Sequence, residues 1–302
     1  MKKIIAFLCI FLLFFTATAH GAPIDPQREA SLTLQYRRGE QVFPGLTVKT
    51  FRVAEVFADG TFALTGEFKK YPVNIYGITT REEWKNIAST LSAYATADQL
   101  APTFKAATDE TGGVFFSGIR PGMYLTQSVR TETVVFEDVL TVIPQTNENE
   151  EPLYSVTAYP KSRSFSLRPE LLNYKVVKQW KDSEYPEKRP ESVQIEILKD
   201  GVLQSTQTLS AANNWCYSWS AEDDGSKWQA VEREIPGDYT VTVTESSTTI
   251  TITNAYQSET PGEESPPPNT GDTFVLWPYL LAMCLSGGLL VLLALWNRRK
   301  EV

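Results

Sequence analysis

The sequence predicts an all-β protein with two β-sandwich domains, the first of which carries a helical insertion. Short runs of alternating apolar and polar residues recur along residues 22–256. Turn-forming triplets separate many of these runs, as in Asp223-Asp224-Gly225 and Pro236-Gly237-Asp238. Regularly spaced short strands with such turns are typical of β-sandwiches. The roughly 235 residues between the apolar ends are enough for two domains of ordinary size.

Residues 1–21 have the composition of a secretory signal peptide. Lys2 and Lys3 precede an apolar stretch at 4–15, which is followed by small residues such as Ala19 and Ala22. This order is typical of a segment that directs export and is then removed. We therefore expect an exported protein that is cleaved between Ala19 and Ala22.

The first β domain is expected over residues 22–165, with a helical insertion at about 76–102. A capping-box pattern begins at Thr80 and continues to Glu83. Four apolar residues follow at helical spacing: Trp84, Ile87, Leu91 and Tyr94. The strands expected in this domain are 31–36, 47–56, 113–116, 123–128, 133–142 and 154–159. The polar residues 162–168 read as a junction.

The second β domain is expected over residues 170–256. Its predicted strands are 174–180, 193–198, 215–219, 228–232, 239–244 and 248–256. Alternation places Lys178, Glu232 and Asn254 on the apolar faces of three of these strands. Burying any one of them without a partner would be costly. We therefore expect the three side chains to meet.

The chain ends in a polar linker, 257–266, and a segment at 267–302 that has the features of a membrane anchor. The linker has too few apolar residues to fold. The apolar run at 273–296 is long enough to form a transmembrane helix. The basic cluster Arg298-Arg299-Lys300 places the end of the chain in the cytoplasm by the positive-inside rule.

Composition excludes several classes of function. The single histidine, His20, lies at the predicted cleavage region, so triads with a histidine base and histidine zinc sites are not expected. Of the three cysteines, only Cys216 lies outside the two apolar ends, which excludes an intramolecular disulfide there. The net charge of −8 argues against a nucleic-acid partner. We expect no cofactor, no metal and no enzymatic activity, and we interpret the acidic run at 147–151 as a solvated loop.

Several motifs of the second domain resemble the collagen-adhesin B-type (Cna B) repeat. They are Val177-Lys178-Gln179-Trp180, Glu187-Lys188-Arg189-Pro190, the run at 209–215 and Ile252-Thr253-Asn254-Ala255-Tyr256. The resemblance implies a bond between the Lys178 amine and the side chain of Asn254, with Glu232 shuttling protons. Desolvation would lower the pKa of the lysine and raise that of the acid, as this chemistry needs. The alternative is a buried salt bridge with a nearby amide.

The C-terminal segment resembles the cell-wall sorting signal of Gram-positive surface proteins. Pro267-Pro268-Asn269-Thr270-Gly271 precedes the apolar span and the basic cluster, although the family pattern begins with leucine. The resemblance implies that a sortase cleaves the bond between Thr270 and Gly271. The new carboxyl end would then be joined to peptidoglycan or to another pilin subunit. The alternative is an ordinary membrane anchor.

The first domain resembles the same B-type family and the N-terminal domains of Gram-positive pilins. The similarity lies in residues 108–116 and 120–124. The lysine–asparagine bond is expected to be absent from this domain. Tyr36 or Gln35 occupies the lysine position, Gln127 the acid position and Ser162 the asparagine position. Residues 156–161 resemble the pilin motif, which makes Lys161 a candidate acceptor for the sorting-signal threonine of the next subunit. The alternative is a solvated lysine at a strand end.

These observations predict a pilin-like or stalk-like structural protein, held at the cell wall or membrane with its β domains outside. The alternative is a monomeric wall-anchored adhesin that binds a host or matrix protein through the first domain. Its helical insertion is the expected place for such a site, because recognition is often carried by segments added to a rigid scaffold.

Overall fold

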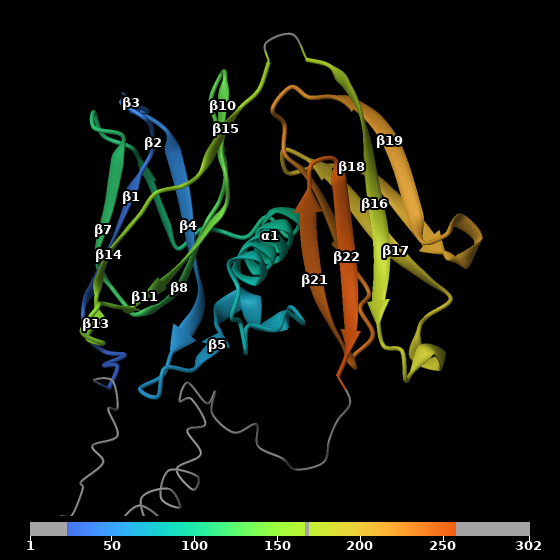
Figure 1. Ribbon diagram of the computed structural model, residues 1–302, viewed down its shortest axis with the longest axis horizontal. Helices are drawn as coiled ribbons and strands as arrows, with labels where there is room; N and C mark the ends of the chain where they lie inside the picture. Colours follow the sequence, from blue (N-terminus) through green and yellow to red (C-terminus); the bar gives the residue numbers. More distant parts are fainter. Residues whose placement is uncertain (1–22, 167–168, 258–302) are drawn as a thin grey trace, which may run out of the picture. The chain divides into compact units, whose positions relative to one another are not determined.

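The computed structural model describes residues 23–166 and 169–257, whose regular structure is mostly β-strand (Figure 1). The predicted signal peptide, sorting signal and transmembrane helix lie outside the described residues, as does nearly all of the predicted linker. No helix within the described ranges is both long and apolar enough to cross a bilayer.

Residues 23–166, called here the N-terminal half, contain two principal sheets. One has the strand order β14-β1-β7, and the other has the order β11-β8-β4-β5 with β6 also paired to β4. The strands are β1 (Ala30–Gln35), β2 (Arg37–Arg38), β3 (Gln41–Val42), β4 (Thr47–Val56), β5 (Phe62–Leu64), β6 (Phe104–Ala107), β7 (Gly113–Ile119), β8 (Gly122–Thr126), β9 (Val129–Arg130), β10 (Val134–Phe136), β11 (Val139–Ile143), β12 (Gln145–Thr146), β13 (Pro152–Leu153), β14 (Ser155–Ala158) and β15 (Ser162–Ser164).

The inward faces of these two sheets share one apolar core. Leu32 and Leu34 of β1 are fully buried in it together with Tyr124 of β8 and Ile143 of β11. On β1 the buried residues alternate with half-buried ones, as the period of a strand requires. The predicted sandwich is therefore present in this half.

Two predictions about strands in this half are wrong. The strand expected at 133–142 is broken at Glu137 and Asp138, which bond to Lys161 and Ser128 instead of continuing a ladder. The supposed junction is partly a strand, since β15 pairs with β10. Both deviations depend on hydrogen bonds to other segments of the chain, which local alternation does not indicate.

The predicted helix is α1 (Arg81–Ala97), preceded by the short 3-10 helix η1 (Gly66–Lys70). Its capping box is confirmed. The Thr80 hydroxyl accepts a hydrogen bond from the Glu83 amide at 3.2 Å, and the Glu83 carboxylate accepts one from the Thr80 amide at 2.9 Å. These bonds satisfy amides at the helix start that have no partner within the helix.

Residues 169–257, called here the C-terminal half, form a second sandwich with sheet orders β19-β16-β22-β21 and β18-β17-β20. Its elements are β16 (Leu171–Lys181), η2 (Pro186–Lys188), β17 (Ser192–Lys199), β18 (Val202–Ser210), η3 (Ala211–Asn213), β19 (Cys216–Glu222), β20 (Trp228–Glu232), β21 (Tyr239–Ser246) and β22 (Thr249–Tyr256). The first strand, β16, runs parallel to the last, β22. Strand β18 was not predicted, because this edge strand is mostly exposed and polar and shows little alternation.

Among the described residues no strand of one half pairs with a strand of the other, and the halves meet through α1. All nine residues at 87–95 of this helix are buried. Leu91 belongs to a core cluster that also contains Val243 of β21 and Val231 of β20. Burial on this scale contradicts the placement of an exposed ligand site on this stretch of the helix.

Candidate functional site

Three strands bring together the polar residues that the sequence pattern places in the core. Lys178 lies on β16 and Asn254 on β22 of one sheet, whereas Glu232 lies on β20 of the facing sheet. Lys178 pairs with Ile252 in the parallel register, so Asn254, two residues further on, lies on the same face. The three residues are 3%, 0% and 1% exposed, respectively.

The carboxyl group of Glu232 lies between the other two side chains. Its Oε2 is 3.7 Å from Nζ of Lys178, and its Oε1 accepts a 2.9 Å hydrogen bond from Nδ2 of Asn254. Each carboxyl oxygen therefore faces one of the two nitrogens. Oδ1 of Asn254 and Oε2 of Glu232 are buried and have no hydrogen-bond partner among the described residues.

The surroundings of the lysine amine are largely aromatic. Nζ of Lys178 donates to the carbonyl of Gln179 at 2.9 Å and lies 3.7 Å from the ring centroid of Trp180. The Trp180 ring makes edge contacts with Trp215 and Tyr239, each at a centroid separation of 5.4 Å. These rings keep the amine out of bulk water.

Burial moves both ionisable groups toward their neutral forms. It lowers the pKa of Lys178 to about 8, although the nearby Glu232 carboxylate opposes the shift. Burial also raises the pKa of Glu232, against the opposing effects of Lys178 and Asn254. A neutral amine beside a protonated acid is the pair that nucleophilic attack on an amide requires.

Sequence reasoning missed a second buried acid beside this site. Asp182 accepts hydrogen bonds from Nε of Arg189 at 2.8 and 2.9 Å and from the Tyr239 hydroxyl at 2.8 Å. These bonds hold the pKa of Asp182 below its usual range, and the carboxylate tends to raise the pKa of Lys178. The resemblance to the B-type repeat covered Arg189 without indicating its partner.

The structure brings no comparable set together on β1 of the N-terminal half. The inward side chains of β1 are Ala30, Leu32 and Leu34. Tyr36 is buried with no hydrogen-bond partner for its hydroxyl, and Gln127 donates instead to Thr96 of α1. Ser162 does not lie on the strand parallel to β1, which ends at Ala158, so its assignment to the asparagine position is wrong.

The other predicted site residues lie apart from this cluster. Lys161 is exposed between β14 and β15, where its carbonyl accepts a 2.8 Å hydrogen bond from the Glu137 amide. Thr270 and Gly271 lie outside the described residues. Within residues 23–166 and 169–257 no group of three or more potential metal-ligating side chains comes together.

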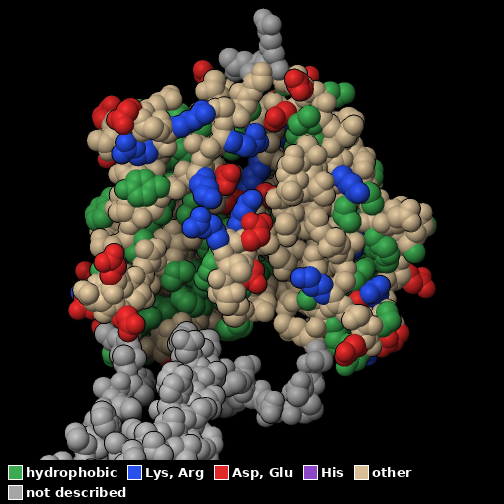
Figure 2. All heavy atoms as spheres, viewed as in Figure 1, with side chains coloured by type: hydrophobic (Ala, Val, Ile, Leu, Met, Phe, Trp, Pro, Cys, Tyr) green, Lys and Arg blue, Asp and Glu red, His purple; other side chains and the backbone are tan. Residues whose placement is uncertain are grey.

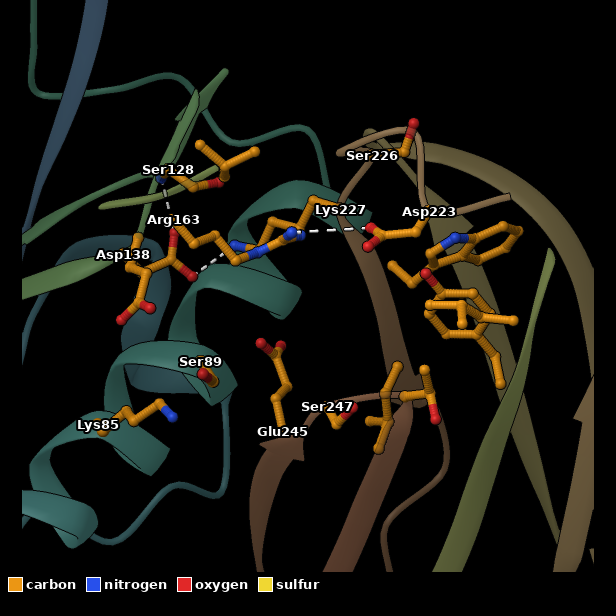
Figure 3. A pocket seen from close by; sticks show the side chains of 17 residues that line it. Lys85, Ser89, Ser128, Asp138, Arg163, Asp223, Ser226, Lys227, Glu245 and Ser247 are labelled. Atoms are coloured by element: carbon orange, nitrogen blue, oxygen red, sulfur yellow. Dashed lines mark hydrogen bonds and ion pairs between the residues drawn. The ribbon is translucent and has the colours of Figure 1, made fainter. Parts of the chain in front are cut away.

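A cavity of about 350 Å³ lies between α1 and the C-terminal sandwich, and Figure 3 shows the polar side chains that face it. Lys227 bonds to Asp138 across it, and Arg163 pairs with Asp223. Oε1 of Glu245 is buried here, and no residue in the described part of the chain hydrogen-bonds to it. Burial raises the pKa of this carboxyl group.

Residues 174–255 match the family model of the Cna protein B-type domain, and this range contains Lys178, Glu232 and Asn254. No curated protein matches the chain.

Three similar solved structures come from surface proteins. A single B repeat of the collagen-binding surface protein of Staphylococcus aureus is 13% identical, and the alignment covers 76% of this chain and 98% of that one with a TM-score of 0.27. The major pilin SpaD of Corynebacterium diphtheriae is 17% identical, with coverages of 78% and 66% and a TM-score of 0.30. The T6 backbone pilin of Streptococcus pyogenes is 12% identical, with coverages of 77% and 65% and a TM-score of 0.32.

The buried acid in the cavity generates a prediction about stability. The folded protein binds the Glu245 proton more tightly than the unfolded chain does, so stability falls as pH rises from the unfolded pKa toward the raised folded pKa. Lys227 and Lys85 oppose this shift, whereas Asp138 and Glu137 reinforce it. Above that window we expect Glu245→Gln to raise the free energy of unfolding by roughly 1 kcal/mol, because the neutral amide avoids the desolvation cost of the carboxylate.

Urea unfolding of the variant and the wild type at several pH values between 4 and 8 measures this difference. Glu191→Gln, at an exposed position, is the matched control and should leave the curve unchanged. A Glu245→Gln variant less stable than the wild type at pH 8 would contradict the assignment of a destabilising buried charge.

Proposed function

We propose that the chain is a pilin-like or stalk-like surface subunit whose C-terminal half cross-links itself through Lys178 and Asn254. The observation that carries the proposal is the position of the Glu232 carboxyl group, which contacts the amine with one oxygen and the amide nitrogen with the other. The match of residues 174–255 to the B-type domain supports the same conclusion.

The reaction exchanges one amide for another. The neutral amine of Lys178 attacks Cγ of Asn254 to give a tetrahedral intermediate, and the bond from Cγ to Nδ2 then breaks. Glu232 starts protonated, delivers its proton to the departing nitrogen, which leaves as ammonia, and takes a proton from the attacking nitrogen, so that it ends protonated again. One C–N bond forms, one breaks, and no oxidant or cofactor takes part.

A bond at this place would change how the C-terminal half carries tension. Force applied to the ends of this half enters at the start of β16 and leaves at the end of β22. A bond from Lys178 to Asn254 joins these strands directly, so the chain between them bears little load. By analogy with disulfides across long loops, the cross-link would contribute about 4 kcal/mol to stability. Both properties suit a stalk on a cell surface.

We further propose that the protein is exported and anchored by a sortase, which places its β domains outside a Gram-positive cell. The support is the order of features at 267–302: the Pro267–Gly271 pentapeptide, the apolar span and the basic cluster. The partners are the sortase, the membrane through the apolar span before cleavage, and peptidoglycan or another subunit after it.

The alternative of a monomeric adhesin loses part of its expected binding surface, whereas residues 79–83 at the start of the helical insertion are exposed. Residues 87–95 of α1 are buried between the two halves and are not available to a host or matrix protein. A structural role is therefore the better supported function.

The cross-link is tested by mass. In a proteolytic digest of the full chain, the peptides containing Lys178 and Asn254 should be joined, with a mass about 17 Da below their sum because ammonia is lost. Lys178→Met, Asn254→Ala and Glu232→Gln should each yield the separate peptides. Lys175→Met removes an exposed lysine of the same strand and should leave the cross-link intact. Separate peptides in the wild type would reduce the cluster to a buried salt bridge beside an amide.

Anchoring is tested by fractionation. Thr270→Ala should move the protein from the cell-wall fraction to the membrane fraction, because a sortase forms its intermediate at this threonine. The C-terminal segment should stay attached to the β domains in the variant and be removed in the wild type. Unchanged fractionation would mean that the apolar span alone holds the protein.

Polymerisation is tested by the ladder of high-mass species expected on a denaturing gel of wall extracts. Lys161→Arg should abolish the ladder while the monomer remains attached to the wall, since arginine keeps the charge but is not a usable nucleophile. Lys105→Arg, at another exposed lysine, is the matched control. A ladder that persists in Lys161→Arg would assign the acceptor role elsewhere, and a wild type without a ladder would favour the monomeric adhesin.

A further inference from the structure

The C-terminal sandwich has an open side that is closed by the N-terminal half. On this side, β20 is the edge strand of one sheet and β21 is the edge strand of the other, and α1 contacts both. Figure 1 shows the helix lying beside β21. Glu232 is the last residue of β20, so the reacting cluster lies next to the seam that the helix covers.

On β21 the N-terminal half takes the place of a neighbouring strand. The Val243 amide donates to the Thr90 hydroxyl of α1, and the Val241 amide donates to the Pro72 carbonyl, both at 2.8 Å. An edge strand without such partners presents a row of unpaired backbone groups. The first bond ties the helix, and the second ties the segment before it, to the sheet that holds Lys178 and Asn254.

On β20 the helix bonds to the backbone of the proposed acid itself. The Tyr94 hydroxyl donates to the carbonyl oxygen of Glu232 at 3.1 Å, and both residues are buried. The next residue, Arg233, pairs with Asp98 at the end of α1 and with Glu196 of β17. The end of β20 is thus held by the helix on one side and by its neighbouring strand on the other.

The Tyr94 ring is itself held in place. It stacks on Tyr71 at a centroid separation of 4.4 Å and an interplanar angle of 21°. The Tyr71 hydroxyl donates to Asp98 at 2.7 Å. Burial and the nearby Glu232 raise the pKa of Tyr94, which keeps its hydroxyl protonated as a donor.

We propose that Tyr94 is a positioning residue for the cross-linking reaction and that α1 completes the site, so that full reactivity requires the N-terminal half to be docked. The inference rests on the proposed cross-link. The Glu232 carboxyl must reach Nζ of Lys178 and Nδ2 of Asn254 together, at separations of 3.7 and 2.9 Å. A small displacement of β20 changes both distances, and within the described ranges β20 pairs with one strand, β17.

The helix also determines how much water reaches the acid. Lys178 and Asn254 face the Glu232 carboxyl group, and the Tyr94 hydroxyl bonds to the Glu232 backbone carbonyl. Arg233 points toward Asp98 and Glu196. Asp182 and Arg189 act on the same cluster through Lys178. Loosening α1 would hydrate the cluster, so the pKa of Glu232 would fall and that of Lys178 would rise toward their ordinary values.

The test compares Tyr94→Phe with Tyr71→Phe in the full chain. Both variants keep the stacked rings and remove one hydroxyl hydrogen bond, but only the first removes the bond to Glu232. Cell-free synthesis followed over time, with the cross-linked peptide measured in digests, gives the rate of bond formation. We expect Tyr94→Phe to slow it about threefold to tenfold, the effect of losing one buried hydrogen bond, and Tyr71→Phe to slow it less than twofold.

The pH dependence of that rate distinguishes positioning from a general loss of stability. The wild-type rate should fall in acid, where the amine is protonated, and above about pH 8, where the pair has lost its protons. In Tyr94→Phe, where the cluster becomes hydrated, the fall in rate on the acid side should begin at a lower pH and the fall on the alkaline side at a higher pH. Equal rates and profiles for Tyr94→Phe and the wild type would overturn the role of Tyr94, as would equal slowing by the two variants. Failure of the wild type to form the bond would instead reject the proposed function.

Discussion

A lysine can occupy the core of the C-terminal sandwich only because a carboxyl group and an amide are buried with it. Nζ of Lys178 has no access to bulk water, and an uncompensated ammonium there would be strongly disfavoured. Glu232 supplies the opposing group from the facing sheet, while Asn254 donates to the same carboxyl from the neighbouring strand. The parallel pairing of β16 and β22 places Lys178 and Asn254 on one face, toward the sheet that carries Glu232. Desolvation destabilises the charged forms of Lys178 and Glu232. It thereby favours the neutral amine and the protonated acid, which are the reactive forms.

The contact between Glu232 and α1 extends this constraint into the N-terminal half. The helix begins at a capping box, continues through nine consecutive buried residues and covers the edges of both sheets of the other half. Its hydroxyl groups at Thr90 and Tyr94 bond to the backbone of β21 and β20. A segment inserted into one sandwich therefore serves as a structural part of the other. The two halves share a hydrophobic cluster although they share no β-sheet among the described residues.

Charged groups along the seam between the halves contribute in a different way. Figure 2 shows basic and acidic side chains gathered there. The pairs Arg130–Asp200 and Arg163–Asp223 are partly exposed, with separations of 3.7 Å, and such pairs add little stability individually. The pair Lys227–Asp138 is more buried and links the turn before β20 to the break between β10 and β11. Apolar packing of α1 joins the two halves, and the charged pairs lie beside it.

The sequence by itself determined the features that depend on neighbouring residues. Alternation with a period of two placed Lys178, Glu232 and Asn254 on buried faces, and the cost of burying each alone implied that they meet. The capping box and the spacing of Leu91 and Tyr94 located the helix. In each case the signal lies within one strand or a few helical turns, where geometry follows directly from the order of residues.

Only the tertiary structure decided which distant segments complete these elements. Nothing within α1 indicates that Tyr94 bonds to a residue 138 positions further along the chain, because its helical spacing is that of any core residue. The exposed edge strand β18 lacks a regular alternation of apolar and polar residues. The break after Phe136 follows from hydrogen bonds to Ser128 and Lys161. The partner of Asp182 was equally hidden. Such pairings depend on how the whole chain packs. A local pattern of apolar residues indicates that a segment is buried, but it does not indicate which other segment covers it.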